Sequence, residues 1–457
     1  MRDLLIGAVL LYFAARSLGM PWIGIMFWTF VSIMNPHQIS WRFSSMPVAM
    51  TAALLTLGSM LVSKEPKRLP MTREVIILLL FMAWMTITFL ANGDYSRHYP
   101  GWNKVMKIDF MILIALVVLY SRQHMVVLTW VLVISIGYWG VKGGAFTIMT
   151  GGNYRVWGPP TSFIEGNNEL ALALIMTIPL MRFLQIQANN KWIKRALAVS
   201  MLLCAASAIG THSRGALLAI VAMGAVFWWR GDKKVLTGSV IVMVALAVWT
   251  FMPAHWFDRM ETIQTYEEDE SAMGRIRTWI TAYNVANDRF FGAGFGMYNA
   301  EIFARYAPNP EEIRAAHSIY FQILGEHGWV GLGIYLVMWF FVWSSAGKLR
   351  KLGRAQPETK WISDLGSMCQ VSMVGFATGG AFLSLAYFDL PYNILVLVVL
   401  ARVWLASRAW ETEPVVPGKL AYAFGVSHTL VLPPKSDSAK GAGRPAMGGT
   451  RQQPPAR

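Results

Sequence analysis

The feature that most constrains this chain is a series of apolar runs, each about 15–25 residues long, between residues 4 and 405. A run of this length, coiled as a helix, crosses a hydrocarbon core about 30 Å thick and satisfies its own backbone hydrogen bonds there. Only 14% of the 457 residues are charged, against roughly 25% in an ordinary soluble domain. The sequence therefore predicts an all-α polytopic integral membrane protein and excludes a soluble enzyme.

The excess of positive charge indicates an orientation in the membrane. The net charge is +15, which in a soluble protein would point to nucleic acid. Here the Lys and Arg residues concentrate in short connections between apolar runs, where they mark the cytoplasmic side. Those connections are Lys64–Arg73, Arg182–Arg195, Arg230–Lys234 and Lys348–Lys360. Even numbers of runs separate these connections, as is required if all four face the cytoplasm. Thirteen spans would put the N-terminus outside, whereas treating the first two short runs, split by Arg16 and Pro21, as one broken or re-entrant span gives twelve. We expect about twelve transmembrane helices, both termini in the cytoplasm and no nucleic-acid partner.

This topology divides the chain into four parts. They are an N-terminal transmembrane bundle (1–252), a large periplasmic loop (253–317), C-terminal transmembrane helices (318–410) and a disordered cytoplasmic tail (411–457). Within the loop, Thr281–Phe290 and Tyr298–Tyr306 are typical of short amphipathic helices, and the acidic run Glu267–Glu270 is typical of a solvated turn. Beyond Trp410 the chain is rich in Pro, Gly, Ser and Lys, and Lys435–Arg457 has almost nothing to bury.

The sequence offers no metal site. Cys204 and Cys369 both lie in apolar segments and are interpreted as small packing residues. No cluster of His, Cys and carboxylate residues has the spacing of a ligand set. We therefore expect neither a metal nor a cofactor.

Ionisable residues gather at the predicted periplasmic ends of the helices, where each is costly to keep close to lipid. They are Arg155, Arg214, Arg275, Arg277 and His317. Guanidinium forks hold the several charges of a pyrophosphate, and an imidazole with a near-neutral pKa exchanges a proton. Each arginine alone is equally compatible with snorkelling at the headgroups, but their position on one side favours a shared site.

Two further histidines are weaker candidates. His212 precedes Arg214 and is placed to form a hydrogen bond within that turn. His327 lies nearly three helical turns past His317, at about 3.6 residues per turn. We therefore expect His327 deeper in the span, satisfied by a neighbour or lining a cavity.

Four motifs around the large loop carry a resemblance to a known family. They are Ser213-Arg214-Gly215, the segment Ser271–Trp279 followed by Gly292–Gly296, His317-Ser318, and Leu324–Gly331. In this order they resemble the O-antigen ligase (WaaL-type) and O-antigen polymerase superfamily of bacterial membrane glycosyltransferases. Met34–His37 and the stretch Arg155–Asn168 are similar to the subgroup labelled O-glycosylation ligases.

The resemblance implies a GT-C-like bundle in the bacterial inner membrane with its active site facing the periplasm. Such an enzyme transfers a glycan from undecaprenyl pyrophosphate to a lipid A-core acceptor, with inversion and without a metal. By the resemblance His317 is the catalytic base, and Arg214, Arg275 and Arg155 bind the donor pyrophosphate. Arg277, His212 and His327 remain further candidates for the site.

Alternatives stay open at this point. A protein O-oligosaccharyltransferase or an O-antigen polymerase would use the same donor with another acceptor. A transporter or flippase for a lipid-linked sugar belongs to a different class and needs polar groups through the whole depth of the bilayer. Central stretches such as Ile112–Leu119 and Ile241–Val248 are apolar, which favours the ligase.

Overall fold

The computed structural model describes residues 2–41, 43–230, 234–261 and 270–429, and within these ranges every regular element is a helix. The first half of the chain contains α1 (Arg2–Ser17), α2 (Pro21–Met34), α3 (Val48–Val62), α4 (Arg73–Asn92), α5 (Tyr95–Val118), α6 (Arg122–Met149), α7 (Asn167–Gln187) and α8 (Lys191–Gly210). The second half contains α9 (Arg214–Arg230), α10 (Lys234–Phe251), α11 (Ala254–Glu261), α12 (Glu270–Asp288), α13 (Ala300–Tyr306), α14 (Ile319–Leu352), α15 (Lys360–Gly379), α16 (Asp389–Ala406) and α17 (Lys419–Ala423). Short 3₁₀ turns connect several of them.

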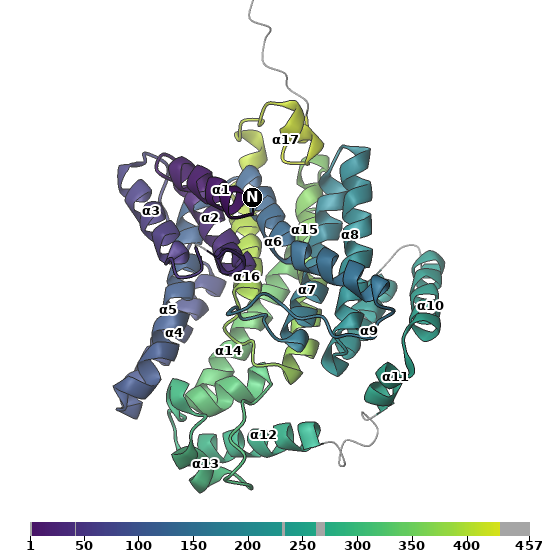
Figure 1. The fold of residues 1–457 in the computed structure, drawn as a ribbon. Helices are drawn as coiled ribbons and strands as arrows, with labels where there is room; N and C mark the ends of the chain where they lie inside the picture. Colours follow the sequence, from purple (N-terminus) through teal and green to yellow (C-terminus); the bar gives the residue numbers. More distant parts are fainter. Residues whose placement is uncertain (1, 42, 231–233, 262–269, 430–457) are drawn as a thin grey trace, which may run out of the picture.

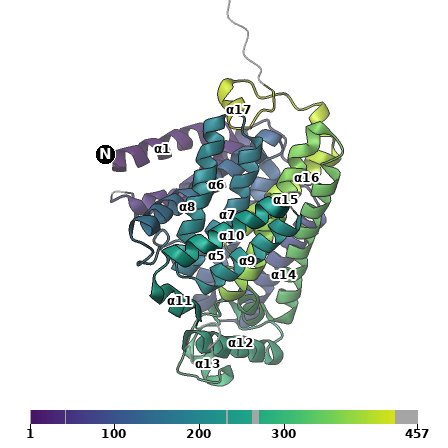
Figure 2. The same cartoon turned by 90° about the vertical axis from the view of Figure 1, so that its right-hand side faces the viewer.

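The helices form an elongated bundle with two distinct ends (Figures 1 and 2). We call the end that carries α12 and α13 the loop end, and the end that carries α17 the tail end. Among the described residues, six helices are long and apolar enough to cross a membrane, namely α4, α6, α7, α8, α14 and α16. Three shorter apolar helices, α2, α3 and α9, accompany them. The chain is thus a multi-pass membrane protein, and the count of twelve crossings stays a prediction.

Small residues let the central helices approach closely. On α6, Gly140, Gly143 and Gly144 face α8, where a Cβ atom on Gly144 would lie only 2.1 Å from the carbonyl oxygen of Leu203. A Cβ atom on Gly140 would lie 2.4 Å from the sulfur of Cys204. Contacts of this kind hold helices together in lipid, where apolar burial gives no net gain. Both cysteines are buried and unbridged, which confirms the predicted packing role.

The large loop is more helical than predicted. The amphipathic helix expected at Thr281–Phe290 begins at Glu270 as α12, so Arg275 and Arg277 lie on a helix. The reason is that its buried face, Gly274, Thr278, Thr281, Ala282 and Val285, keeps helical spacing back into the arginine segment. Tyr298–Tyr306 is confirmed as a helix, α13. Of the acidic run Glu267–Glu270, the first three residues lie outside the described residues.

Helix α14 is kinked where the loop returns to the bundle. Gly328 has a left-handed backbone, with φ 68°. A Cβ atom there would lie 2.4 Å from the carbonyl oxygen of Phe290, and one on Gly292 would lie 2.7 Å from the backbone nitrogen of Gly328. The backbone N–H of Ala293 donates to the carbonyl of Gly325 at 2.8 Å. The segment after α12 is therefore seated directly on the backbone of α14.

The predicted disordered tail is wrong for residues 411–429. This stretch contains α17 and folds back over the tail end of the bundle (Figure 1). Trp130 Nε1 donates to the carbonyl of Phe424 at 3.0 Å, and the backbone N–H of Asn189 donates to that of Ala423 at 3.1 Å. Composition misses this segment because backbone carbonyls make part of the contacts and only a few apolar side chains join them, such as Phe424, whose ring centroid lies 5.2 Å from that of Trp130. Residues 430–457 lie outside the described residues.

The orientation can be tested with single cysteines. In intact cells, an impermeant thiol reagent should label Asn153→Cys and Asn309→Cys, which lie toward the loop end, and should not label Lys234→Cys. Both natural cysteines are buried, so the background should be low. Labelling of Lys234→Cys before lysis would reverse the proposed orientation.

Candidate active site

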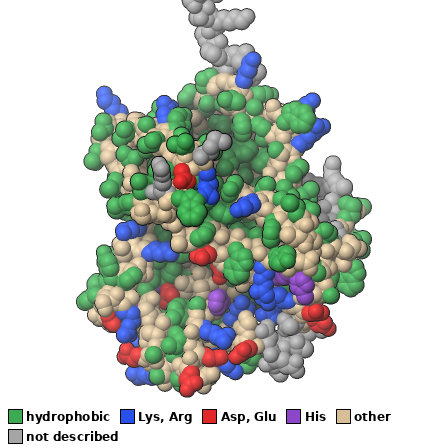
Figure 3. Space-filling model, viewed as in Figure 1, with side chains coloured by type: hydrophobic (Ala, Val, Ile, Leu, Met, Phe, Trp, Pro, Cys, Tyr) green, Lys and Arg blue, Asp and Glu red, His purple; other side chains and the backbone are tan. Residues whose placement is uncertain are grey.

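A cavity of about 250 Å³ opens at the loop end of the bundle, where α7, α9 and α12 meet. Polar and charged residues line one part of it, and apolar residues line the rest. The lining residues are Asn168, Ser213, Arg214, Gly215, Leu218, Arg259, Ala272, Arg275, Ile276, Trp279, Phe382 and Leu383. Figure 3 shows a group of Lys and Arg side chains, with His beside it, on the lower half of this face. The cavity therefore joins a cationic site to an apolar wall.

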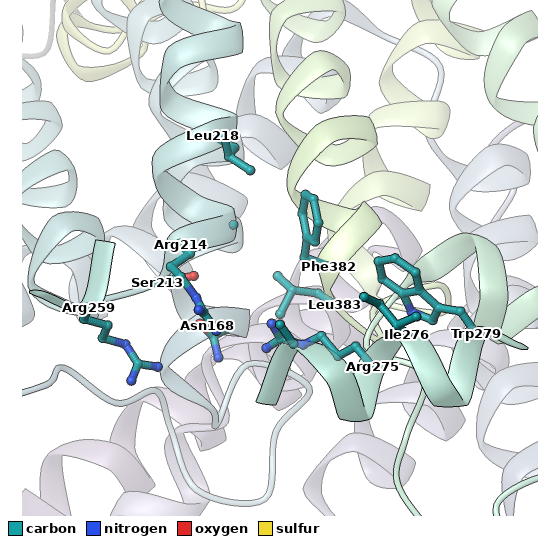
Figure 4. A pocket seen from close by; sticks show the side chains of 12 residues that line it. Asn168, Ser213, Arg214, Leu218, Arg259, Arg275, Ile276, Trp279, Phe382 and Leu383 are labelled. Atoms are coloured by element: carbon teal, nitrogen blue, oxygen red, sulfur yellow. The ribbon is translucent and has the colours of Figure 1, made fainter. Parts of the chain in front are cut away.

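Three guanidinium groups come to this cavity from three different helices. Arg214 is the first residue of α9, which is capped by Ser213: its hydroxyl accepts from the backbone N–H of Ala216 at 3.2 Å. Arg275 projects from α12 toward the Arg214 side (Figure 4). Arg259, on α11, donates from Nε to the carbonyl of His212 at 2.9 Å. Arginine forks at fixed positions suit an anion with several oxygens, such as a pyrophosphate.

The start of α7 completes the polar side of the cavity. Asn167 donates from Nδ2 to the carbonyl of Thr211 at 2.8 Å, which ties α7 to the turn before Arg214. The next residue, Asn168, lines the cavity, and Glu169 interacts electrostatically with Arg275. One carboxylate thus opposes part of the arginine charge, and the cavity stays cationic.

His317 lies beside the cavity without lining it. Its backbone is left-handed, with φ 43°, and its N–H donates to Ser384 Oγ at 2.9 Å. Trp279, which lines the cavity, donates from Nε1 to the carbonyl of Ala316 at 2.7 Å. The ring nitrogen Nδ1 of His317 is buried and has no hydrogen-bond partner among the described residues. A strained backbone and an unpaired polar atom at one residue are typical of a functional position.

The surroundings of His317 favour its neutral form. Burial is the main cause that lowers the pKa of His317 below its ordinary value of 6.5, and the nearby charges of Arg275 and Arg314 lower it further. At neutral pH the imidazole is therefore unprotonated. A neutral imidazole is able to accept a proton, as a general base must.

Two of the predicted arginines lie elsewhere. Arg155 is exposed and interacts electrostatically with His212 rather than lining the cavity. Arg277 also stays outside the cavity, because its Nη1 lies 2.7 Å from the carboxylate of Glu312 in an ion pair. Glu312 also pairs with Arg314, at 3.5 Å. Arg277 therefore helps to hold the segment that contains Arg314, next to His317.

The two weaker candidates, His212 and His327, are buried and are held by neighbouring groups. His212 is buried, and its Nε2 lies 2.9 Å from the carbonyl of Gly152, which ties two connections together. Burial lowers the pKa of His212. His327 is wholly buried at the kink of α14, with Nδ1 2.7 Å from Thr88 Oγ1 and Nε2 2.8 Å from the hydroxyl of Tyr387. Of the two alternatives expected for His327, satisfaction by neighbouring side chains is confirmed.

Sequence reasoning missed several residues of this site, namely Arg259, Asn168, Trp279 and Arg314. Asn168 stands in the polar segment that opens α7 and was accessible to the same reasoning as Arg214. A lone arginine in a polar loop, such as Arg259 or Arg314, gives no such signal. Within the described ranges, no group of three or more His, Cys, Asp or Glu residues is placed to hold a metal ion.

The fold and the cavity together define a class: a multi-pass membrane protein with a cationic site at one end of its bundle. Residues 199–336, which include Arg214, Arg275 and His317, match the family model described as O-antigen ligase. The chain therefore contains an O-antigen ligase domain over these residues, as its motifs predict, and this match supports a glycosyltransferase-like enzyme of the ligase or polymerase type. Residues 1–189 match a family of unknown function (DUF5935), so closeness to the O-glycosylation ligases stays a prediction. A search of curated proteins finds no match.

Proposed function

We propose that this protein transfers a glycan from undecaprenyl pyrophosphate to lipid A-core on the periplasmic side of the bacterial inner membrane. The observation that carries the proposal is the cavity in which Arg214, Arg259 and Arg275 meet, with His317 next to Arg275. The match of residues 199–336 to the O-antigen ligase family supports this reaction type. A cationic cavity joined to an apolar wall suits a donor with a charged head and a lipid chain.

The arginines act on the leaving group. As the bond between the anomeric carbon and the pyrophosphate oxygen breaks, negative charge grows on the departing lipid pyrophosphate. Arg214 and Arg275 stabilise this charge most in the transition state, because they are already in place before it develops. Arg214 also stands at the N-terminus of α9, where the helix dipole favours an anion.

His317 acts on the acceptor. Its neutral imidazole removes the proton from an acceptor hydroxyl as that oxygen attacks the anomeric carbon from the face opposite the pyrophosphate. One carbon–oxygen bond forms, the other breaks, and the configuration at the anomeric carbon inverts. This route needs no metal. A pair of carboxylates, as in glycosidases, is not required because a pyrophosphate leaves without being protonated first.

The acceptor is tested by direct transfer. Purified protein is mixed with an undecaprenyl-pyrophosphate glycan and with one of three acceptors: lipid A-core, a hydroxyl-bearing protein, or a second lipid-linked glycan. Transfer to lipid A-core alone is expected. Transfer only to the protein would identify an O-oligosaccharyltransferase, and transfer only to the second glycan would identify a polymerase. Movement of the donor across a bilayer without any transfer would indicate a flippase.

The base is tested by comparing two histidines. His317→Ala should reduce turnover per folded molecule by about 10²–10⁴-fold, the usual contribution of a positioned acid or base. Donor binding should persist, because the arginines remain. The matched variant His327→Ala removes a buried histidine that has partners on both nitrogens, so it should lower thermal stability and leave turnover per folded molecule close to normal. Near-normal turnover of intact His317→Ala would disprove its role.

The donor site is tested by changing geometry while keeping charge. Arg275→Lys should reduce kcat/KM by about 10- to 100-fold, because a lost hydrogen bond to a charged group is worth about 1.5–3 kcal/mol. Arg277→Lys is the matched control, two residues away on α12 and outside the cavity, and should have little effect. Equal losses in the two variants would argue against a specific contact from Arg275.

The pH dependence tests the electrostatics around His317. A base whose pKa is lowered stays active as the pH falls through the ordinary histidine range, and activity is lost only below it. Removing a nearby positive charge with Arg314→Gln should raise the pKa of His317 and move the acid limb of the kcat/KM profile to higher pH. Arg305→Gln, which removes a positive charge on α13 that pairs with Asp288, should leave that limb in place. If the acid limb of the kcat/KM profile does not move in Arg314→Gln, the pKa of His317 does not control that limb.

A further inference from the structure

The peptide unit that joins Ala316 to His317 is held at both of its polar atoms. Its carbonyl oxygen, on Ala316, accepts from Nε1 of Trp279 at 2.7 Å. Its N–H, on His317, donates to Oγ of Ser384 at 2.9 Å. Because a peptide unit is planar and its C=O and N–H point in opposite directions, these two bonds fix the orientation of the whole plane.

The backbone of His317 needs such support. Its φ of 43° lies in the left-handed region, which costs free energy for a residue with a side chain. A conformation of this kind persists where the surrounding structure over-determines it. On the far side of His317, α14 begins at once, and the carbonyl of Ser318 accepts from the backbone N–H of Gln322 at 2.9 Å. A fixed peptide plane and a helical turn therefore set the direction of the His317 side chain between them.

The two side chains that form these bonds are themselves held by the bundle. Trp279 stacks on Phe321 of α14, with ring centroids 5.0 Å apart and 6° between the ring planes. Ser384 lies in the connection between α15 and α16. In that connection, the backbone N–H of Ala386 donates to Oε1 of Gln322 at 3.4 Å. Both hydrogen-bond partners of the peptide unit are thus attached to α14, the helix that His317 precedes.

Both bonds also come from the wall of the donor cavity. Trp279 lines that cavity, and so does Leu383, the residue before Ser384 (Figure 4). Phe382, a third lining residue, has its ring 6.4 Å from that of Trp279. The backbone before His317 is therefore attached to the surface that a bound donor would contact.

We propose that Ser384 and Trp279 are positioning residues, which hold the imidazole of His317 in line with the acceptor hydroxyl. This inference rests on the proposed role of His317 as the base. Without either hydrogen bond, the backbone of His317 relaxes toward negative φ and the ring turns away from the acceptor. Misplacing a reacting group by about 1 Å can cost about 100-fold in rate. The arginines stay in place, so binding of the donor is preserved.

Ser384 gives the cleaner test, because it is not itself a lining residue. In the full chain, Ser384→Ala should lower kcat per folded molecule by about 10- to 100-fold and leave KM for the undecaprenyl-pyrophosphate glycan nearly unchanged. Ser384→Thr keeps the hydroxyl and should recover kcat. The matched control is Ser372→Ala, which removes a hydrogen bond of 2.7 Å from α15 to the carbonyl of Met176, outside the cavity. An equal loss in Ser372→Ala, or no recovery in Ser384→Thr, would overturn the proposal.

The other bond is tested with a second pair of variants. Trp279→Phe keeps an aromatic ring against Phe321 and removes only the Nε1–H, and it should also lower kcat. Trp329→Phe is its control, since Trp329 donates from Nε1 to Oδ1 of Asn287 at 3.0 Å and so also links α14 to α12. That control should turn over normally. Near-normal kcat in Trp279→Phe would contradict a hold on both atoms of the peptide unit.

A double-mutant cycle connects the effect to the imidazole. If Ser384 acts through His317, adding Ser384→Ala to His317→Ala should lower turnover by less than about twofold, because the two residues act as one unit. Full additivity would mean that Ser384 acts without His317, against the proposal. A loss in His317→Ala with near-normal kcat in Ser384→Ala would overturn this inference and leave the proposed function in place. Near-normal turnover of His317→Ala would overturn both.

Discussion

The structure depends on one constraint: inside a hydrocarbon core there is no water, so the backbone N–H and C=O groups must form hydrogen bonds with the chain itself. The long helices follow from it, and so does the scarcity of charge in their middle portions. Groups such as Arg214 and His317 are consequently found where helices end and connections begin. The proposed catalytic and donor-binding residues are therefore gathered at the loop end by the same requirement that builds the bundle.

Positioning at that end relies on contacts between elements rather than on any single loop. α12 packs its small residues against α14, and Trp279 of α12 holds the carbonyl next to His317. Asn167 of α7 holds the turn that precedes Arg214 through a hydrogen bond to the backbone. Arg275 and His317 thus belong to one packed layer, in which the arginines are oriented before a substrate arrives. Such preorganisation is what electrostatic stabilisation of a leaving group requires.

The sequence predicted those parts of the site in which an ionisable residue lies directly beside an apolar run. Arg214 between two apolar runs and His317 at the start of another were found in this way. Arg277 was kept as a further candidate because its partner, Glu312, lies 35 residues further along the chain and no local pattern indicates the ion pair. Arg259 was overlooked because an arginine in a polar loop is ordinary. The start of α12 was predicted too far along the chain. Its first turns bury Gly and Thr rather than large apolar residues, and the arginines beside them made this segment resemble a polar loop.

The contact between Gly292 and Gly328 has a consequence for how this chain tolerates change. Each glycine occupies space that a side chain on the other would need, since the backbones of the two segments touch. Substitution at one position therefore alters what is acceptable at the other, although 36 residues separate them in the sequence. The two positions should therefore co-vary among related sequences. Their co-variation would report the docking of the loop onto α14 more directly than substitutions of the charged residues do.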